Sequence, residues 1–400
     1  MFIKRKMLPY IVQAAKEFPV IAIVGPRQTG KTTLAQIVFP EHKYISLEDL
    51  DMRLLASEDP RRFLSEYPSK NGLILDEIQH VPQLLSYMQT IVDREKKNGF
   101  YIITGSQNFL VNEAITQTLA GRISIFTLLP LSISELQDAE LIPEHIDTLI
   151  YKGMYPRAYA QEMSIERLHK NYIQSYIERD VRQIKQVTDL SLFQKFLQLC
   201  VGRIGQVVNL TTLGNDCGIT QNTVKSWLSL LESSYIIFLL HPYYKNFGKR
   251  IIKSPKLYFI DTGIACSLLG ISSIQQLANH YLKGGLFESF MLADLLKQQY
   301  NQDQRANLYF WRDHTGNELD GIIEFQQKLV SIEIKSGKTV NPDFFKNLLH
   351  FQKITATPRD ESFVIYGGDQ DQPWPHAQVM SWKSAGSFLE ALRDKKNIED

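Results

Sequence analysis

The chain has 400 residues, of which 44% are hydrophobic and 22% are charged, values typical of an ordinary soluble protein with two or three domains. Its formal net charge of +1 excludes a general electrostatic attraction to nucleic acid or anionic lipid, so any such binding needs a local patch. The 3 cysteines form no C-x-x-C pair, and no apolar run approaches the roughly 20 residues of a membrane span. We therefore expect a cytoplasmic protein without zinc knuckle, disulfide framework or membrane contact.

A phosphate-binding motif is the first element predicted along the chain. The segment GPRQTGKT, residues 25–32, fits the pattern G-x-x-x-x-G-K-[ST]; an apolar strand, 19–24, precedes it and a helical stretch, 33–38, follows it. Backbone N–H groups of such a loop bind phosphates, while Lys31 would reach the β/γ-phosphates and the Thr32 hydroxyl would bind Mg²⁺. We predict an ATP site formed by Gly25, Pro26, Arg27, Gln28, Thr29, Gly30, Lys31, Thr32 and Thr33.

An acidic strand end supplies the second part of this site. The segment GLILDE, residues 72–77, is a short apolar strand that ends in two carboxylates. We predict that Asp76 holds Mg²⁺ through water and that Glu77 polarises the water that attacks ATP. A third strand, 100–104, also ends in polar residues, and the candidates for orienting that water are Thr104, Ser106 and Asn108.

Further strands at 44–49 and 123–128 alternate with helical stretches. This alternation predicts an α/β fold with a doubly wound, mostly parallel sheet, which binds ligands at the carboxyl ends of its strands. The transition-state charge on the γ-phosphate usually needs an arginine as well. Arg122, which directly precedes the last of these strands, and Arg179, in a later helical region, are the two candidates for this catalytic role.

The middle of the chain predicts a winged helix. Residues 131–195 read as mainly helical, and two further helices, 210–217 and 221–231, meet at a glycine turn as in a helix-turn-helix. Strands at 235–240 and 257–260 then flank a basic stretch. The second helix of the pair places apolar side chains on one face that we expect to be buried: Val224, Trp227, Leu228 and Leu231.

Two groups of polar side chains in this module are candidates for DNA contact. Basic residues of the hairpin could neutralise phosphates: Lys249, Arg250, Lys253 and Lys256. Polar residues of the second helix could face base edges: Gln221, Asn222 and Lys225. Because winged helices also serve as protein-interaction or lid modules, the sequence leaves DNA binding and protein docking both open.

A carboxylate–lysine pattern near the C-terminus is the last motif. Three strands are expected there: 308–312, 319–325 and 329–334. Asp320 opens the second strand, Glu333 and Lys335 close the third on one face, and Glu288 lies in a helical stretch upstream. Clustered carboxylates bind Mg²⁺ and a neighbouring lysine stabilises a pentavalent phosphate, so we predict four catalytic residues with the metal at Asp320 and Glu333. This is the D…E-x-K pattern of the restriction-endonuclease-like fold; a salt-bridged sheet edge is the alternative.

Several sequence motifs occur in a recognisable order: GPRQTGKT at 25–32, LILDEIQ at 73–79, ITGSQN at 103–108, LAGR at 119–122, RDV at 179–181, KSPKLYFIDTG at 253–263 and GNELD…IEIK at 316–335. Together they resemble the prokaryotic ATPases of the AAA superfamily that carry a C-terminal domain of unknown function. The resemblance covers nearly the whole chain.

The resemblance implies an architecture and assigns residues to two sites. It implies an AAA-type P-loop core at 1–130, a helical lid at 131–195, a winged helix at 196–265 and a nuclease-like α/β domain at 266–400. By the same resemblance, the nucleotide and Mg²⁺ site contains Lys31, Thr32, Asp76 and Glu77, and the nuclease-like site contains Glu288, Asp320, Glu333 and Lys335.

Three functions are compatible with these motifs. The leading hypothesis is Mg²⁺-dependent ATP hydrolysis coupled to a C-terminal region that binds DNA, with or without cleaving it. The second is an ATP-driven regulatory switch whose C-terminal domains dock a protein partner and have no nuclease activity. The third is a nuclease gated by the ATPase. A homo-oligomer in which a neighbour supplies the arginine and a single-chain ATPase are both open.

Overall fold

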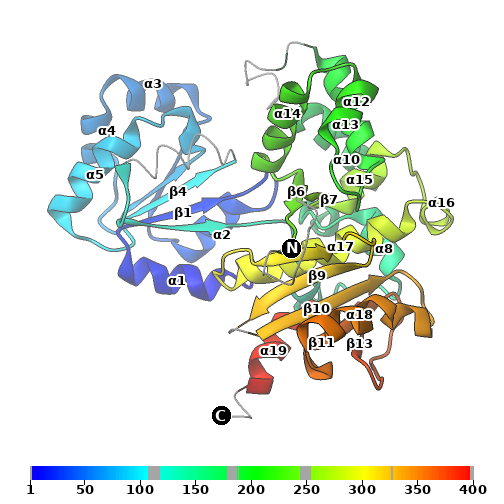
Figure 1. Cartoon of the computed structure of the whole chain (residues 1–400). Helices are drawn as coiled ribbons and strands as arrows, with labels where there is room; N and C mark the ends of the chain where they lie inside the picture. Colours follow the sequence, from blue (N-terminus) through cyan, green and yellow to red (C-terminus); the bar gives the residue numbers. More distant parts are fainter. Residues whose placement is uncertain are drawn as a thin grey trace. The chain divides into compact units, whose positions relative to one another are not determined.

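A computed structural model describes residues 2–106, 118–177, 187, 189–243, 254–325 and 328–396 (Figure 1). The chain divides into two compact units. The first contains Met1–Leu131 with two short later segments, Ser233–Tyr235 and Tyr300–Gln304. The second contains Ser132–Glu232, Ile236–Gln299 and Arg305–Asp400.

The first unit is built on a parallel sheet, as the alternating strands and helices predicted. Its strands are β1 (Val20–Val24), β2 (Lys43–Ser46), β3 (Leu73–Asp76), β4 (Tyr101–Gly105) and β5 (Ile123–Thr127). In the described part of this unit, 5 strands pair in the order β2-β3-β4-β1-β5, and every pair is parallel. The order places β4 between β1 and β3, so the carboxyl ends of these three strands lie next to one another.

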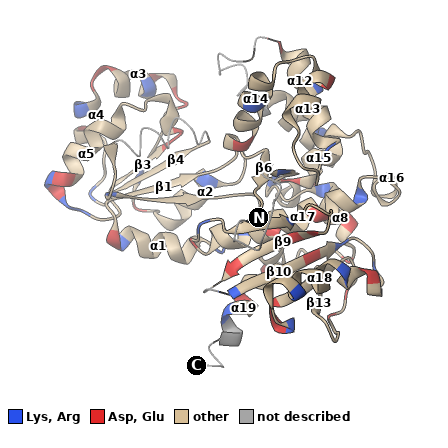
Figure 2. Cartoon of the chain, in the orientation of Figure 1, with Lys and Arg blue, Asp and Glu red and all other residues tan. Residues whose placement is uncertain are grey.

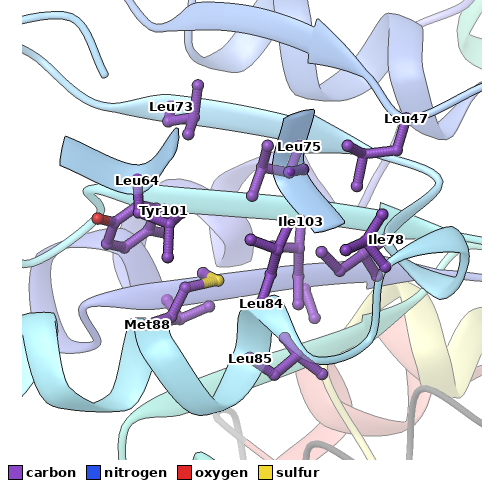
Figure 3. Packing of buried hydrophobic residues seen from close by; sticks show 14 of the residues in the cluster. Leu47, Leu64, Leu73, Leu75, Ile78, Leu84, Leu85, Met88, Tyr101 and Ile103 are labelled. Atoms are coloured by element: carbon purple, nitrogen blue, oxygen red, sulfur yellow. The ribbon is translucent and has the colours of Figure 1, made fainter. Parts of the chain in front are cut away.

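Helices cover both faces of this sheet. They are α1 (Leu8–Glu17), α2 (Lys31–Val38), α3 (Leu50–Glu58), α4 (Pro60–Glu66) and α5 (Leu84–Glu95), with a 3-10 turn, η1, at Ile78–His80. Successive residues of β1 point to opposite faces: Ile21 and Ile23 pack with α1 and α2, while Ala22 packs with the cluster formed by α3, α4 and α5. Figure 3 shows part of that second cluster, including Leu64 of α4 and Leu84 and Met88 of α5. A strand buried on both faces explains its continuous apolar run.

The second unit begins with helices. They are α7 (Ile133–Asp138), α8 (Ile146–Lys152), α9 (Arg157–Ala160), α10 (Ile165–Tyr172), a π-turn, η2, at Ile173–Ile177, α12 (Leu190–Val201), α13 (Leu210–Cys217) and α14 (Gln221–Ser233). Two strands, β6 (Ile237–Leu240) and β7 (Lys256–Phe259), then pair antiparallel.

The predicted helix pair in this unit is present as α13 and α14. Gly218 ends α13 in the left-handed region, at φ 84°, which a residue without Cβ adopts without strain. The four apolar residues predicted for one face of α14 are all buried, and Trp227 stacks edge-on against Phe193 and Phe196 of α12. The periodicity of the sequence therefore identified the packed face correctly.

The second unit also contains a mixed sheet. Its strands are β8 (Leu308–Arg312), β9 (Glu318–Phe325), β10 (Lys328–Lys335), β11 (Ser362–Tyr366), β12 (Gln372–Pro373) and β13 (Gln378–Ser381). Over the described residues, 6 strands pair in the order β12-β13-β11-β10-β9-β8. β8, β9 and β10 are antiparallel neighbours, and β11 pairs parallel with both β10 and β13. The three predicted strands are thus confirmed, and β9 and β10 form a hairpin.

Further helices complete this unit. They are α15 (Thr262–Leu268), α16 (Ile274–Ala278), α17 (Lys283–Asn301), α18 (Lys346–Thr355) and α19 (Phe388–Lys396), with 3-10 turns η3 (Pro342–Phe345), η4 (Arg359–Glu361) and η5 (Ser384–Ser387). Side chains of η3 and α18 pack against the sheet in a cluster that includes Trp311, Phe345 and Phe351. None of the helices in the described part of the chain has the length and apolar character needed to cross a membrane.

Candidate functional site

The loop between β1 and α2 has the backbone conformation that its glycines permit. Gly25 has φ 146°, and a Cβ atom added there would lie 2.2 Å from the carbonyl oxygen of Leu128. Gly30 has φ 89° and immediately precedes α2. The helix therefore begins at Lys31 with its N-terminus next to the loop, which is the arrangement that binds a phosphate group.

Side chains of the loop are directed toward its own backbone. Lys31 is 5% exposed, and its Nζ atom donates a hydrogen bond of 2.8 Å to the carbonyl oxygen of Pro26. The hydroxyl group of Thr29 donates to the same oxygen at 2.9 Å. These bonds close the loop into a compact turn around the Lys31 ammonium group.

Arg5 also holds this loop, although no sequence motif pointed to it. Its guanidinium group is buried and donates to the carbonyl oxygen of Thr29 at 2.9 Å and to that of Leu129 at 2.7 Å. The second bond joins residues that are far apart along the chain, so it ties the loop to the segment that follows β5. Inspection of local sequence cannot find such a contact.

Asp76 lies at the end of β3 and accepts hydrogen bonds from hydroxyl groups. Among the residues that the structure describes, its partners are Thr32, at 2.9 and 3.0 Å, Tyr44, at 2.9 Å, and Thr104. A carboxylate surrounded by hydroxyl groups rather than ammonium groups is a suitable ligand for a hard divalent cation. The geometry thus brings together Thr32 and Asp76, the two residues predicted to bind Mg²⁺, and adds Tyr44.

Glu77 is held beside Asp76 in an uncommon backbone conformation, at φ 56°. Its carboxylate accepts a hydrogen bond of 3.0 Å from the Ser106 hydroxyl and another from the Gln79 amide. Burial alone would raise the pKa of Glu77, but the positive charge of Lys31, the Gln79 hydrogen bond and the charge of Arg27 outweigh burial, so the pKa is lowered. Glu77 is therefore ionised at neutral pH and can accept a hydrogen bond from water.

Of the two candidate arginines, the structure describes Arg122, which lies away from this site in its own chain. Arg122 precedes β5, and the register Val20↔Ile123 places it at the amino end of the strands, opposite the P-loop. It forms an ion pair with Asp93 instead, with one N–H···O distance of 2.9 Å. Arg122 therefore does not reach the P-loop of its own chain, and its catalytic role stays a prediction for an oligomer in which a neighbour supplies the arginine. Arg179 and Asn108 lie outside the described residues.

The four predicted residues of the C-terminal pattern come together in the second unit. The β9–β10 pairing includes Ile332↔Gly321, so Asp320 and Glu333 are the next residues on the two strands and share a face. The Asp320 carboxylate accepts a hydrogen bond of 2.8 Å from the backbone N–H of Ile334. Lys335 pairs with Glu333 at 2.6 Å.

The lysines near this cluster only partly offset the repulsion between its carboxylates. Burial and the negative charge of Asp320 raise the pKa of Glu333 to about 8 and that of Glu288 to about 7, against the opposing effect of nearby lysines. Within the described part of the chain, the Oε2 atom of Glu333 is buried without a hydrogen-bond partner. A carboxylate oxygen in this situation is suited to a cation or a water molecule.

A metal ion in this cluster would depend partly on water ligands. In the part of the chain that the structure describes, no group of three or more His, Cys, Asp or Glu side chains is arranged to hold a metal ion. Magnesium ions are commonly bound through one or two carboxylates with water as the remaining ligands. The residues present therefore fit Mg²⁺ at Asp320 and Glu333 only in that form.

Lys256 lies in this cluster and not on a DNA-facing hairpin. Its side chain is buried and pairs with Glu288 at 3.2 Å and with Glu318. The prediction that Lys256 neutralises DNA phosphates is wrong, because its ammonium group is buried and already paired with carboxylates. A basic stretch of sequence does not reveal which of its lysines is buried. The other predicted hairpin cations, Lys249, Arg250 and Lys253, lie outside the described residues.

The polar residues of α14 are exposed, as a contact role requires. Gln221, Asn222 and Lys225 all lie on the accessible face of the helix, and the Gln221 amide donates to the Thr211 hydroxyl at 2.6 Å. In Figure 2, acidic and basic positions are interspersed along the helices of both units. Exposure leaves both DNA and protein contact open for this helix.

Comparison with known proteins assigns the first unit. Residues 17–137 match a family model described as an AAA domain, residues 143–275 match a domain of unknown function (DUF8612), and residues 283–385 match another (DUF4143). The predicted P-loop domain of the AAA type is therefore confirmed. The regions that follow it match families whose descriptions carry no function.

The relatives found by comparison carry no assigned function. The chain is 28% identical to the uncharacterized protein Rv2008c of Mycobacterium tuberculosis, over 95% of this chain and 85% of that protein. It is 24% identical to the uncharacterized protein MJ1637 of Methanocaldococcus jannaschii, over 66% of this chain and 65% of that protein. Among solved structures, the Walker-type ATPase PABY2304 of Pyrococcus abyssi is 14% identical with a TM-score of 0.44, covering 67% of this chain and 96% of that one.

Replacing Arg5 by Met tests its role in holding the loop. Loss of the two charge-assisted bonds to carbonyl oxygens should lower the free energy of unfolding by about 1.5–3 kcal/mol and weaken ATP binding. Denaturant unfolding and nucleotide titration measure the two effects. Lys4→Met, at an exposed neighbouring position, is the matched control and should change neither. Wild-type behaviour of Arg5→Met would contradict the assigned role.

The raised pKa values of Glu288 and Glu333 predict how stability depends on pH. Because the folded protein holds these protons more tightly than the unfolded chain, the free energy of unfolding in EDTA should fall as pH rises from about 4.5 to about 8. Glu333→Gln should reduce that slope, whereas Glu162→Gln, at an exposed site, should leave it unchanged. Chemical denaturation at several pH values gives the slope, and equal slopes in all three proteins would refute the prediction.

Proposed function

We propose that the chain binds ATP with Mg²⁺ at the P-loop and hydrolyses it, and that nucleotide turnover controls the second unit. The observation that supports hydrolysis most strongly is the convergence of Lys31, Asp76 and Glu77 at one edge of the parallel sheet. Strand β4 lies between β1 and β3, so Thr104 and Ser106 bond directly to the two carboxylates. A structural P-loop without catalysis would not need this arrangement.

Each residue has a separate role in the proposed reaction. The loop N–H groups and Lys31 bind the phosphates, and Thr32 and Asp76 hold the cation, which neutralises charge on the phosphate oxygens when it is bound. Glu77 accepts a hydrogen bond from the attacking water and orients it, while Ser106 and Gln79 fix the rotamer of Glu77. Because its pKa is lowered, Glu77 stays ionised and is suited to accepting a hydrogen bond from water and orienting it, more than to acting as a general base that keeps the proton.

For the second unit we propose a winged-helix module and a nuclease-like site that binds a divalent cation. The helix pair α13–α14 followed by the β6–β7 ribbon supports the winged helix. The cation site is supported by the opposed carboxylates of Asp320 and Glu333 and by a buried Glu333 oxygen that has no hydrogen-bond partner among the described residues. DNA is the proposed partner of this unit, and Lys225 of α14 is its exposed cation among the described candidates.

A regulatory switch is the second candidate. The observation in its favour is that lysine side chains already pair with carboxylates of the nuclease-like cluster, as a structural salt-bridge network would. In that case the second unit docks a protein and has no cleavage activity.

The ATPase proposal predicts a selective loss in Glu77→Gln. This variant should bind ATP with nearly unchanged affinity, but its turnover number should fall by about 100-fold or more because the attacking water is no longer oriented by a carboxylate. Steady-state phosphate release, measured alone and with duplex, single-stranded and branched DNA, gives the rate. Glu66→Gln, on an exposed helix face, is the control. Undiminished hydrolysis by Glu77→Gln would refute the assignment, and stimulation by one form of DNA would tie turnover to the second unit.

The nuclease-like proposal predicts cleavage that depends on metal and on Asp320. Wild-type protein with Mg²⁺ or Mn²⁺ should nick DNA, and Asp320→Asn should lower the rate by about 100-fold or more. A supercoiled plasmid assay detects nicking, with the exposed Asp343→Asn as the control. DNA that stays intact with every metal would favour the regulatory switch.

A further inference from the structure

Lys256 is a buried cation outside the D…E-x-K pattern. It begins β7 and is 2% exposed, and its Nζ atom lies 3.2 Å from Oε1 of Glu288 on α17 and also pairs with Glu318 on β9. Burial of an ammonium group is unfavourable unless opposite charges compensate it, and here two carboxylates do so. Three separate elements therefore meet at one positive charge.

Three basic side chains pair with carboxylates of this cluster. Lys335 pairs with Glu333, Lys256 pairs with Glu288 and Glu318, and Arg312 pairs with Glu318 at 3.4 Å. Asp320 lies opposite Glu333 in the β9–β10 pairing, and its carboxylate accepts a hydrogen bond from the backbone N–H of Ile334.

The carboxylate oxygens of Glu288 and Glu333 differ in their hydrogen bonding. Oε1 of Glu288 accepts hydrogen bonds from Lys256 and from the Tyr258 hydroxyl, both on β7. Oε2 of Glu333, a residue that is only 1% exposed, is buried with no hydrogen-bond partner among the residues that the structure describes. Oε2 of Glu333 is therefore available to a divalent cation, whereas Oε1 of Glu288 is already bonded.

We propose that Lys256 is a positioning residue that acts as the internal counter-ion of Glu288 and Glu318 and thereby limits the cluster to one divalent cation, at Asp320 and Glu333. This inference rests on the proposed function because it treats the cluster as a cation site. Mg²⁺ and Mn²⁺ need as few as one or two carboxylates beside water. Arg312 pairs with Oε2 of Glu318, so removal of the Lys256 ammonium group would leave Oε1 of Glu288 and Oε1 of Glu318 to hold a second ion.

Removing the charge of Lys256 while keeping its length tests this role. In nucleotide-free full-length protein, Lys256→Met should bind one more equivalent of Mn²⁺ than the wild type, as counted by electron paramagnetic resonance. Lys256→Arg keeps the charge and should retain the wild-type count, and Lys225→Met removes an exposed lysine and should also retain it. Any Mn²⁺ bound at the P-loop is counted equally in all these proteins, so it does not affect the difference between them.

Thermal stability provides a second measurement. The melting temperature of Lys256→Met should drop in EDTA and recover in Mn²⁺ by a larger shift than the wild type shows, and a variant that folds only with Mn²⁺ would support the proposal. Overturning results are an unchanged Mn²⁺ count in folded Lys256→Met, or a loss of folding that Mn²⁺ does not rescue.

Comparing Glu333→Gln with Lys256→Met distinguishes a failure of the proposed cation site from a failure of the role proposed for Lys256. If Glu333→Gln binds as much Mn²⁺ as the wild type, the site at Asp320 and Glu333 is wrong. An extra equivalent in Lys256→Met would even then support the counter-ion role of Lys256. If Glu333→Gln loses the ion but Lys256→Met gains none, the cation site stands and the role of Lys256 is refuted.

Discussion

The position of β4 between β1 and β3 is the constraint on which the nucleotide site depends. Parallel pairing brings the carboxyl ends of these strands to one edge, so the P-loop, Asp76, Thr104 and Ser106 become neighbours although Gly25 and Ser106 are 81 positions apart in the sequence. Burial of the strands on both faces fixes their register, since a slip by one residue would move every apolar side chain to the wrong face. The catalytic geometry is thus a consequence of core packing.

In the second unit, the candidate cation site depends on the balance between carboxylate and lysine charges. Carboxylates from α17, β9 and β10 are brought close together at low solvent exposure, where like charges repel strongly. Lysines from β7 and β10 offset part of that repulsion, while one Glu333 oxygen has no hydrogen-bond partner in the described part of the chain. This incomplete compensation distinguishes the cluster from a saturated salt-bridge network, and it is the reason for expecting a cation there.

The sequence was informative where function depends on adjacent residues. The P-loop, the acidic end of β3, the strands around Asp320 and Glu333, and the buried face of α14 follow from local pattern and period. Contacts between distant segments were not predictable in this way, as for Arg5 and Tyr44. Burial was misjudged for Lys256, because its neighbours in sequence are basic while its neighbours in space are acidic. Arg122 directly precedes β5, and in a parallel sheet this order places it at the amino ends of the strands, away from the P-loop of its own chain.

The central claim is that the first unit binds ATP through Mg²⁺ held by Thr32 and Asp76. Titration of the full-length protein with a fluorescent ATP analogue, with Mg²⁺ and with EDTA, tests it most directly. Saturable binding that weakens in EDTA, and that Lys31→Ala abolishes and Asp76→Asn makes insensitive to Mg²⁺, is the predicted result. Binding by Lys31→Ala equal to that of the wild type, or no binding by the wild type, would contradict the account.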